Sequence, residues 1–196
     1  MIKKPWTTAI IAPLFLGILS CGGLRYSEVS PDARDFHPQR IAVLPADTRA
    51  FAEAKGDVDR LFAEVLSEKK WFAGVVGGET ISRRMESDGT FRQVITDYLA
   101  KLANVNFSDP ALSGTIGGMT GAEAFLLVRV DYWNYTTQSS DKIAKVSLSI
   151  RMIEAKTGKT LWTAGHHRIS DYMIIKPDLP DVARALIREM IGYMPH

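Results

Sequence analysis

The chain has 196 residues with 24 basic and 22 acidic side chains, which gives a formal net charge of +2. A charge this nearly balanced provides no electrostatic basis for binding nucleic acid. The single cysteine excludes a disulfide within the chain and a metal site built from several thiolates.

The start of the chain predicts a secretory signal that ends in a lipidation site. Lys3 and Lys4 form a short positive region, and a mostly apolar run follows. A transmembrane helix needs about 20 apolar residues, whereas this run is shorter and is interrupted by Pro13. Its last residues, Ile18 to Cys21, resemble a bacterial lipobox, in which the cysteine is acylated and the signal is cleaved before it. An ordinary secretory peptide with an incidental cysteine is the alternative.

We expect residues 1–20 to be a signal peptide, 21–39 a lipid-anchored tether and 40–196 a single α/β domain. About 176 residues remain after cleavage, which is enough to bury a core without disulfides or metals. Cys21 would carry palmitate and related acyl chains, and more than one chain holds a protein stably at a membrane. Gly22 rather than an aspartate follows the cysteine, and by resemblance to enterobacterial sorting this favours the outer membrane, with the domain facing the periplasm.

The first half of the domain predicts strands that alternate with helices. Arg40 to Pro45 is a continuous apolar run, typical of a strand buried on both faces. Asp57 is predicted to cap one helix, and Thr90 begins a capping box at the start of another. The other expected elements are a strand at 72–76, a helix at 79–87 and a helix that begins at Asp109-Pro110.

The second half changes to a period of two residues, which is typical of half-buried strands. Leu126, Val128, Val130 and Tyr132 are expected to share one face. The pattern predicts an antiparallel meander, followed by a helix, with strands near 124–138, 142–154 and 160–173. The predicted fold class is α/β (α+β), a mixed β-sheet with helices packed on it.

Short segments of the chain resemble a group of bacterial outer-membrane lipoproteins. They are Ile41 to Pro45, Gly121 to Ala124, and Thr157 to Lys159 followed by Leu161-Trp162. The group includes the curli secretion lipoprotein and the lipoprotein activator of a peptidoglycan synthase, and its core is similar to the amino-terminal domain of TolB. This resemblance covers most of the region from Arg40 to Tyr172. It implies the same α/β fold and a role in the cell envelope.

Candidate catalytic and metal-binding residues each have a simpler structural explanation. His166 and His167 are adjacent on a predicted strand, so they point to opposite faces and cannot easily share one metal ion. Asp57 and Asp59 suit the start of a helix, which favours acidic side chains electrostatically. We therefore expect no enzymatic activity, no cofactor and no metal site.

Tyr132, Trp133 and Tyr135 are the candidate partner-binding residues. Large aromatic side chains are enriched at the centres of protein interfaces. The alternative explanation is that these rings pack in the core or lean over the edge of the sheet.

Together these patterns predict a non-catalytic outer-membrane lipoprotein that acts as a protein-binding scaffold or adaptor in envelope assembly. It would meet the membrane through lipidated Cys21 and bind an envelope protein, with oligomers possible and no nucleic acid involved. One alternative is a subunit of an oligomeric secretion pore. Another is a regulator of a peptidoglycan synthase, for which residues 21–39 are a short tether.

Overall fold

A computed structural model of the protein describes residues 24–196. The predicted signal peptide and the predicted lipidation of Cys21 lie outside the described residues. The strands are β1 (Tyr26–Val29), β2 (Arg40–Val43), β3 (Gly74–Val76), β4 (Ala124–Gln138), β5 (Asp141–Glu154) and β6 (Thr160–Tyr172). The helices are α1 (Asp57–Lys69), α2 (Glu79–Ser87), α3 (Gly89–Val105), α4 (Pro110–Thr120) and α5 (Leu179–Ile191), with short 3₁₀ turns at Pro31–Ala33 and Ala52–Ala54.

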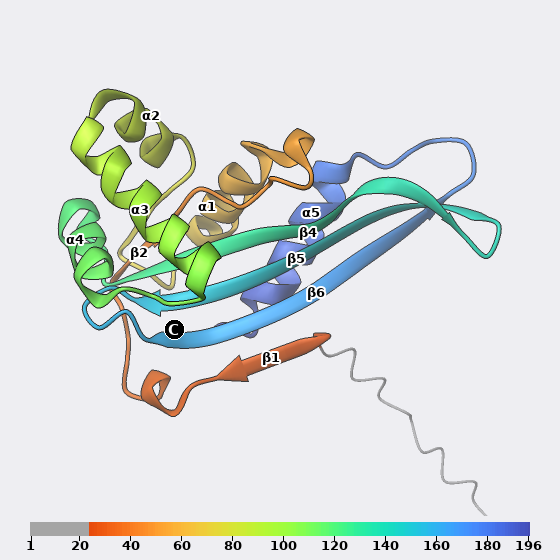
Figure 1. The fold of residues 1–196 in the computed structure, drawn as a ribbon. Coiled ribbons are helices and arrows are strands. Elements are labelled where there is room, and N and C mark those ends of the chain that lie inside the picture. The colour runs from red at the N-terminus through yellow and green to blue at the C-terminus, as the bar shows by residue number, and fades with distance from the viewer. Residues whose placement is uncertain (1–23) are drawn as a thin grey trace, which may run out of the picture.

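The strands form one mixed sheet in the order β1-β6-β5-β4-β2-β3 (Figure 1). β2 runs parallel to both β3 and β4, whereas β4, β5, β6 and β1 pair antiparallel. The predicted fold class, a mixed sheet with helices packed on it, is confirmed. The meander prediction is partly right, because its three strands lie where expected but the antiparallel part continues into β1.

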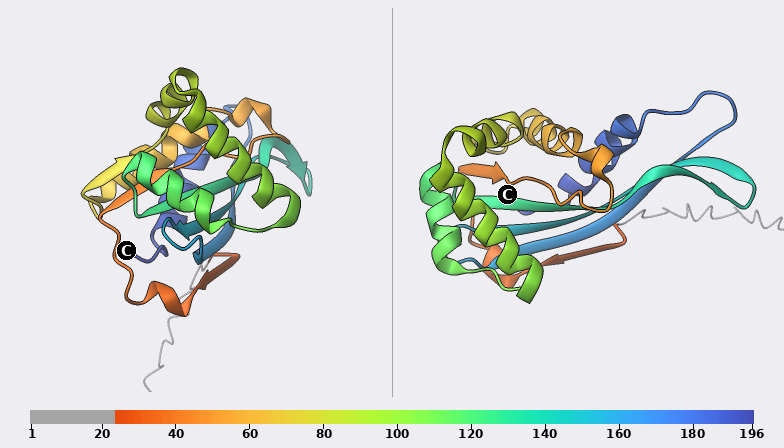
Figure 2. Two further views of the ribbon diagram at one scale, coloured as in Figure 1. Left: turned by 60° about the vertical axis from the view of Figure 1, so that its left-hand side comes forward. Right: turned by 45° about the horizontal axis from the view of Figure 1, so that its top comes forward.

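Helices cover the two faces of the sheet. α1 and α5 pack on what we call the first face, and α2, α3 and α4 pack on the second face (Figures 1 and 2). Alternate residues of β2 enter two separate cores, since Ile41 and Val43 join the first-face core and Ala42 joins the other. All three side chains are at most 2% exposed. The continuous apolar run of this strand therefore reflects burial on both faces, as predicted.

The long strands β4, β5 and β6 extend well beyond α2, α3 and α4 (Figure 1). We call their far end the distal end; it contains the β4–β5 turn at residues 139–140 and the loop that joins β6 to α5. On the second face, no helix of residues 24–196 lies above these outer halves of the strands (Figure 2). The fold thus combines a fully covered half of the sheet with a half that is open on one side.

The segment predicted as a tether over residues 21–39 already belongs to the sheet at β1. The indole Nε1 of Trp162 donates a hydrogen bond to Ser27 Oγ at 2.9 Å. Tyr26 lies across Gly165, where any added side chain would overlap its ring. The tether prediction is therefore wrong for this part of the chain. A four-residue edge strand held by backbone pairing is too short to show a period of two in the sequence.

Two helix starts differ from those predicted. Asp88, in extended conformation, caps α3 by accepting a hydrogen bond from an amide of the first turn at 3.0 Å, and Thr90 lies inside the helix. Asp57 is the first residue of α1 rather than its cap, because Gly56 occupies the cap position with a φ of 84°. α4 begins as predicted, since Asp109 accepts from two amides of its first turn at 2.9 and 3.1 Å.

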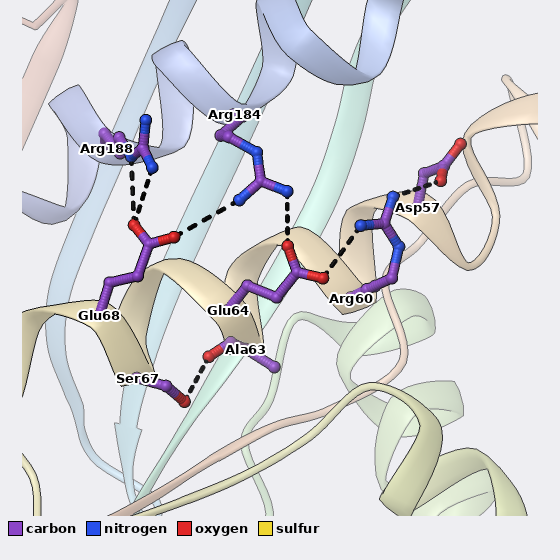
Figure 3. A network of polar contacts seen from close by, with 8 residues as sticks. All are labelled: Asp57, Arg60, Ala63, Glu64, Ser67, Glu68, Arg184 and Arg188. Carbon is purple, nitrogen blue, oxygen red and sulfur yellow. Dashed lines mark hydrogen bonds and ion pairs between the residues drawn. The ribbon is translucent and has the colours of Figure 1, made fainter.

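Ion pairs join α1 to α5 along their exposed sides (Figure 3). Glu64 binds Arg60 of its own helix at 3.0 Å and Arg184 of α5 at 2.5 Å, and the two guanidinium groups hold its pKa below the ordinary value. Glu68 pairs with Arg184 and Arg188 at 3.6 and 2.9 Å. Exposed pairs of this kind contribute at most about 1 kcal/mol each. The network therefore adds modestly to the α1–α5 contact, while apolar burial beneath the two helices supplies most of its stability.

Candidate functional site

A β-bulge in β4 decides which face of the sheet each of the three candidate aromatic residues takes. The register of β4 against β5 shifts between Val130 and Tyr132, which leaves Asp131 as the extra residue. Because a bulge reverses the faces of the residues that follow, Trp133 rather than Tyr132 takes the next position on the first face. Trp133 is 2% exposed and belongs to the first-face core. The predicted common face was therefore wrong at Tyr132.

Tyr132 and Tyr135 are both half-buried, but on opposite faces. Tyr132 packs on the second face, with its ring centroid 5.5 Å from that of Phe51 and 5.1 Å from the ammonium of Lys145. Tyr135 lies against the first-face core and its hydroxyl donates to the Pro177 carbonyl at 2.9 Å. The three candidate residues therefore do not form one surface, and only the two tyrosines reach the exterior.

The uncovered part of the second face carries a set of polar side chains. Arg129 Nε donates to Asp131 at 2.7 Å, the Ser149 hydroxyl also bonds to Asp131, and the Tyr26 hydroxyl donates to Ser149 at 3.4 Å. These bonds link three strands and hold the side chains in place across the sheet. We call this surface the open face; it comprises Tyr26, Arg129, Asp131, Tyr132, Lys145, Ser147, Ser149 and His167.

The adjacent histidines lie on opposite faces, as predicted. His166 Nδ1 accepts from the Arg25 amide at 3.0 Å, and its Nε2 lies 3.5 Å from a Glu189 carboxylate oxygen on the first face. Burial lowers the pKa of His167, and the neighbouring His166 lowers it further. These surroundings favour the neutral form of His167, which adds hydrogen-bonding capacity to the open face. Within residues 24–196, no three His, Cys, Asp or Glu side chains gather as a metal site requires.

Asp57 and Asp59 do not form a carboxylate pair. Asp57 binds Arg60 at 3.0 Å on the exposed side of α1, whereas the half-buried Asp59 accepts a hydrogen bond from the Ala46 amide at 2.7 Å. Burial raises the pKa of the Asp59 carboxyl, although the Ala46 hydrogen bond opposes this effect. Asp59 thus fastens the loop after β2 to α1, a structural role beyond the predicted helix start.

The structure also shows an apolar surface that sequence reasoning missed. Met173, Ile174 and Ile175 follow β6 directly and are 90%, 91% and 84% exposed. The predicted third strand ended near residue 173, and no role was predicted for the residues that follow it. The sequence did contain a signal for this surface, because three consecutive apolar residues break the alternation of a half-buried strand. No helix among residues 24–196 is long and apolar enough to cross a membrane.

The structure is a mixed α/β domain whose long antiparallel strands have one open polar face. Comparison with known proteins finds solved structures with a similar fold. No family model and no curated protein matches the chain. The structure is similar to the PelC dodecamer from Paraburkholderia phytofirmans, at 13% identity and a TM-score of 0.53, covering 87% of this chain and 98% of that chain.

Two further solved structures resemble the chain. A PelC variant from the same organism gives a TM-score of 0.51 at 16% identity, covering 81% of this chain and 89% of that chain. A lipoprotein from Neisseria meningitidis is 15% identical and covers 80% of this chain and 100% of that chain, but its TM-score of 0.44 is too low to carry an argument. At these identities, the similarity to PelC establishes a shared fold and nothing about function.

Proposed function

We propose that the chain is a non-catalytic lipoprotein of the bacterial cell envelope that binds a protein partner through the open face. The observation that carries this proposal is the open face itself, a polar surface bonded across three strands and left uncovered by the helices of residues 24–196. Arg129 offers a side chain that is 64% exposed, and Tyr26 and Tyr132 add aromatic area beside it. Arginine and tyrosine are enriched at protein interfaces.

The proposed anchor is an acylated Cys21 in the outer membrane, with the domain in the periplasm. Tyr26, where β1 begins, is five positions after Cys21. Such a segment spans at most about 18 Å when fully extended. The domain would therefore remain close to the membrane that holds its lipid. A partner near the outer membrane is better supported than an inner-membrane peptidoglycan synthase, which lies beyond the peptidoglycan layer.

The anchor is tested by growing cells with radiolabelled palmitate and comparing wild type with Cys21→Ala. Label that requires Cys21 and fractionates with the outer membrane supports the proposal. An unlabelled protein that is released in soluble form from the periplasm would refute the lipoprotein assignment. Label in the inner membrane would correct the location alone.

The binding face is tested by site-specific photocross-linking in cells. A photoreactive residue is placed at Ser147 on the open face and, as a matched control, at Ser82, which is exposed on α2. We expect a cross-link to another protein from position 147 only, and its loss when Lys145→Glu reverses the local charge. Equal cross-linking from both positions, or none from position 147, would refute the open face as the interface.

Self-assembly is a second candidate, in which the chain is one subunit of an oligomeric secretion pore. One observation favours it, namely that the PelC structures sharing this fold are dodecamers. Light scattering of the detergent-solubilised full chain distinguishes the candidates. A mass of many protomers supports assembly, whereas a monomer at all concentrations refutes it.

A further inference from the structure

The most exposed large apolar side chains of residues 24–196 are gathered in one place, the loop that joins β6 to α5. Met173, Ile174 and Ile175 are each at least 84% exposed, whereas the next most exposed, Val105, reaches 67%. Single apolar side chains on a surface need no explanation, but a contiguous cluster marks a site of contact. We refer to these three residues as the apolar loop.

Neighbouring side chains hold the base of the apolar loop against the sheet. The Tyr135 hydroxyl donates to the Pro177 carbonyl at 2.9 Å, and the Tyr172 ring meets the Tyr135 ring edge-on with centroids 5.9 Å apart. The Lys176 ammonium lies 4.5 Å from the Tyr135 ring centroid. The loop therefore presents apolar tips with tyrosines and a lysine directly behind them. This order matches a membrane interface, where aromatic rings and lysines lie at the headgroup level and apolar groups lie deeper.

The chain enters the domain from the same direction. β1 runs antiparallel to β6, so the residues before β1 arrive from the distal end, and the Arg25 amide bonds to His166. Met173 lies seven positions further along the chain, or about 23 Å along a strand. Cys21 precedes Leu24 by three positions, a span of at most about 11 Å. A lipid on Cys21 and the apolar loop can therefore meet one membrane plane, with the long strands inclined to it.

We propose that the apolar loop inserts into the interfacial region of a phospholipid bilayer as a second membrane contact. The proposed lipid anchor supplies only the location of that bilayer. Charges near the loop are mixed, with Lys142 and Lys176 offset by Asp141, Asp171 and Asp178. Apolar burial rather than charge thus drives the contact, and it is equal for zwitterionic and anionic lipids and insensitive to salt. Two contacts would hold the open face at a defined angle to the membrane.

An environment-sensitive fluorophore attached to Ile174→Cys tests this proposal in the full chain. The protein is reconstituted into phosphatidylcholine vesicles with and without lipids that carry a quencher at the interface. Val105→Cys is the matched control, since it is also apolar and exposed but lies at the end of α3, where Asn106 bonds to Arg151 near the end of β5 that is opposite to the distal end. Thiol labelling of the unmodified chain reports separately whether Cys21 is acylated. If Cys21 is not acylated, the fluorophores at positions 174 and 105 are measured in the Cys21→Ala background.

We expect vesicles to shift the emission at position 174 to shorter wavelength and the quencher lipid to reduce it at least twofold, with no change at position 105. Equal, weak quenching at both positions would overturn the proposal even if Cys21 is acylated. A blue shift that needs no lipid and grows with protein concentration would also overturn it, because a second copy of the chain would then cover the loop. A free thiol at Cys21 would remove the proposed anchor and leave the probe result to stand by itself.

Discussion

Gly117 and Gly118 are neighbours in α4, yet the structure predicts that alanine changes stability in opposite directions at the two positions. A Cβ at Gly117 would lie 2.7 Å from the Ala155 Cβ and 3.1 Å from the Ala122 carbonyl oxygen. No atom of residues 24–196 lies within 4 Å of a Cβ at Gly118. Alanine adds about 0.5–1 kcal/mol of helix propensity at either site. Only Gly117→Ala also overpacks a core contact, which costs about 1–3 kcal/mol.

The two variants should therefore differ in free energy of unfolding by the overpacking cost, about 1–3 kcal/mol. With a urea slope of about 2–3 kcal/mol/M, their midpoints should be separated by about 0.3–1.5 M, with Gly118→Ala the more stable. Adding Ala155→Gly removes the closest contact, so a double-mutant cycle with Gly117→Ala should show favourable coupling. Coincident midpoints, or a cycle without coupling, would show that α4 does not pack tightly on the turn after β5.

Three further predictions follow from individual contacts. Asp59→Asn keeps an acceptor for the Ala46 amide and removes a buried charge. Because burial raises the pKa of Asp59, the wild-type protein loses stability as pH rises above the ordinary value of 3.8. Urea unfolding should therefore show the variant to be more stable than the wild type at neutral pH but not at acidic pH. Gly165→Ala should push the Tyr26 ring aside and remove hydrogen-exchange protection from β1 alone; protection that survives would contradict the close approach. Trp133→Ala should cost about 3–5 kcal/mol and Tyr132→Ala about 1 kcal/mol or less. The reverse order in urea unfolding would contradict the position of the bulge.

Much of the fold follows from local pattern. The run from Arg40 to Pro45 indicated a strand buried on both faces, and the structure places it inside the sheet with a core on each side. The period of two after residue 124 located three strands to within one residue. Such patterns can be recognised in a sequence because a buried face requires an apolar residue at every second position of a strand and at every third or fourth position of a helix.

The candidate site was less accessible to this reasoning. Tyr132, Trp133 and Tyr135 were grouped by sequence proximity, whereas strand alternation places Tyr132 opposite the other two, and the residue inserted at Asp131 decides which face is the core. A bulge depends on how β4 pairs with β5, and neither strand shows it separately. The cap of α3 was misplaced for a similar reason, because Asp88 and a nearby threonine both suit the role and the backbone conformation selects between them.

The sequence by itself determined most of the segments that form strands and helices after residue 39, because alternation and helical spacing record local burial. Only the tertiary structure decided that Tyr26–Val29 is a strand rather than a tether, since an edge strand depends on a partner more than 130 positions away. It also decided that Arg129, Asp131 and Ser149 meet on the open face, and that Met173 to Ile175 stand clear of the core. Surfaces are assembled from residues distant in the chain, so their composition follows from packing and not from any local run of residues.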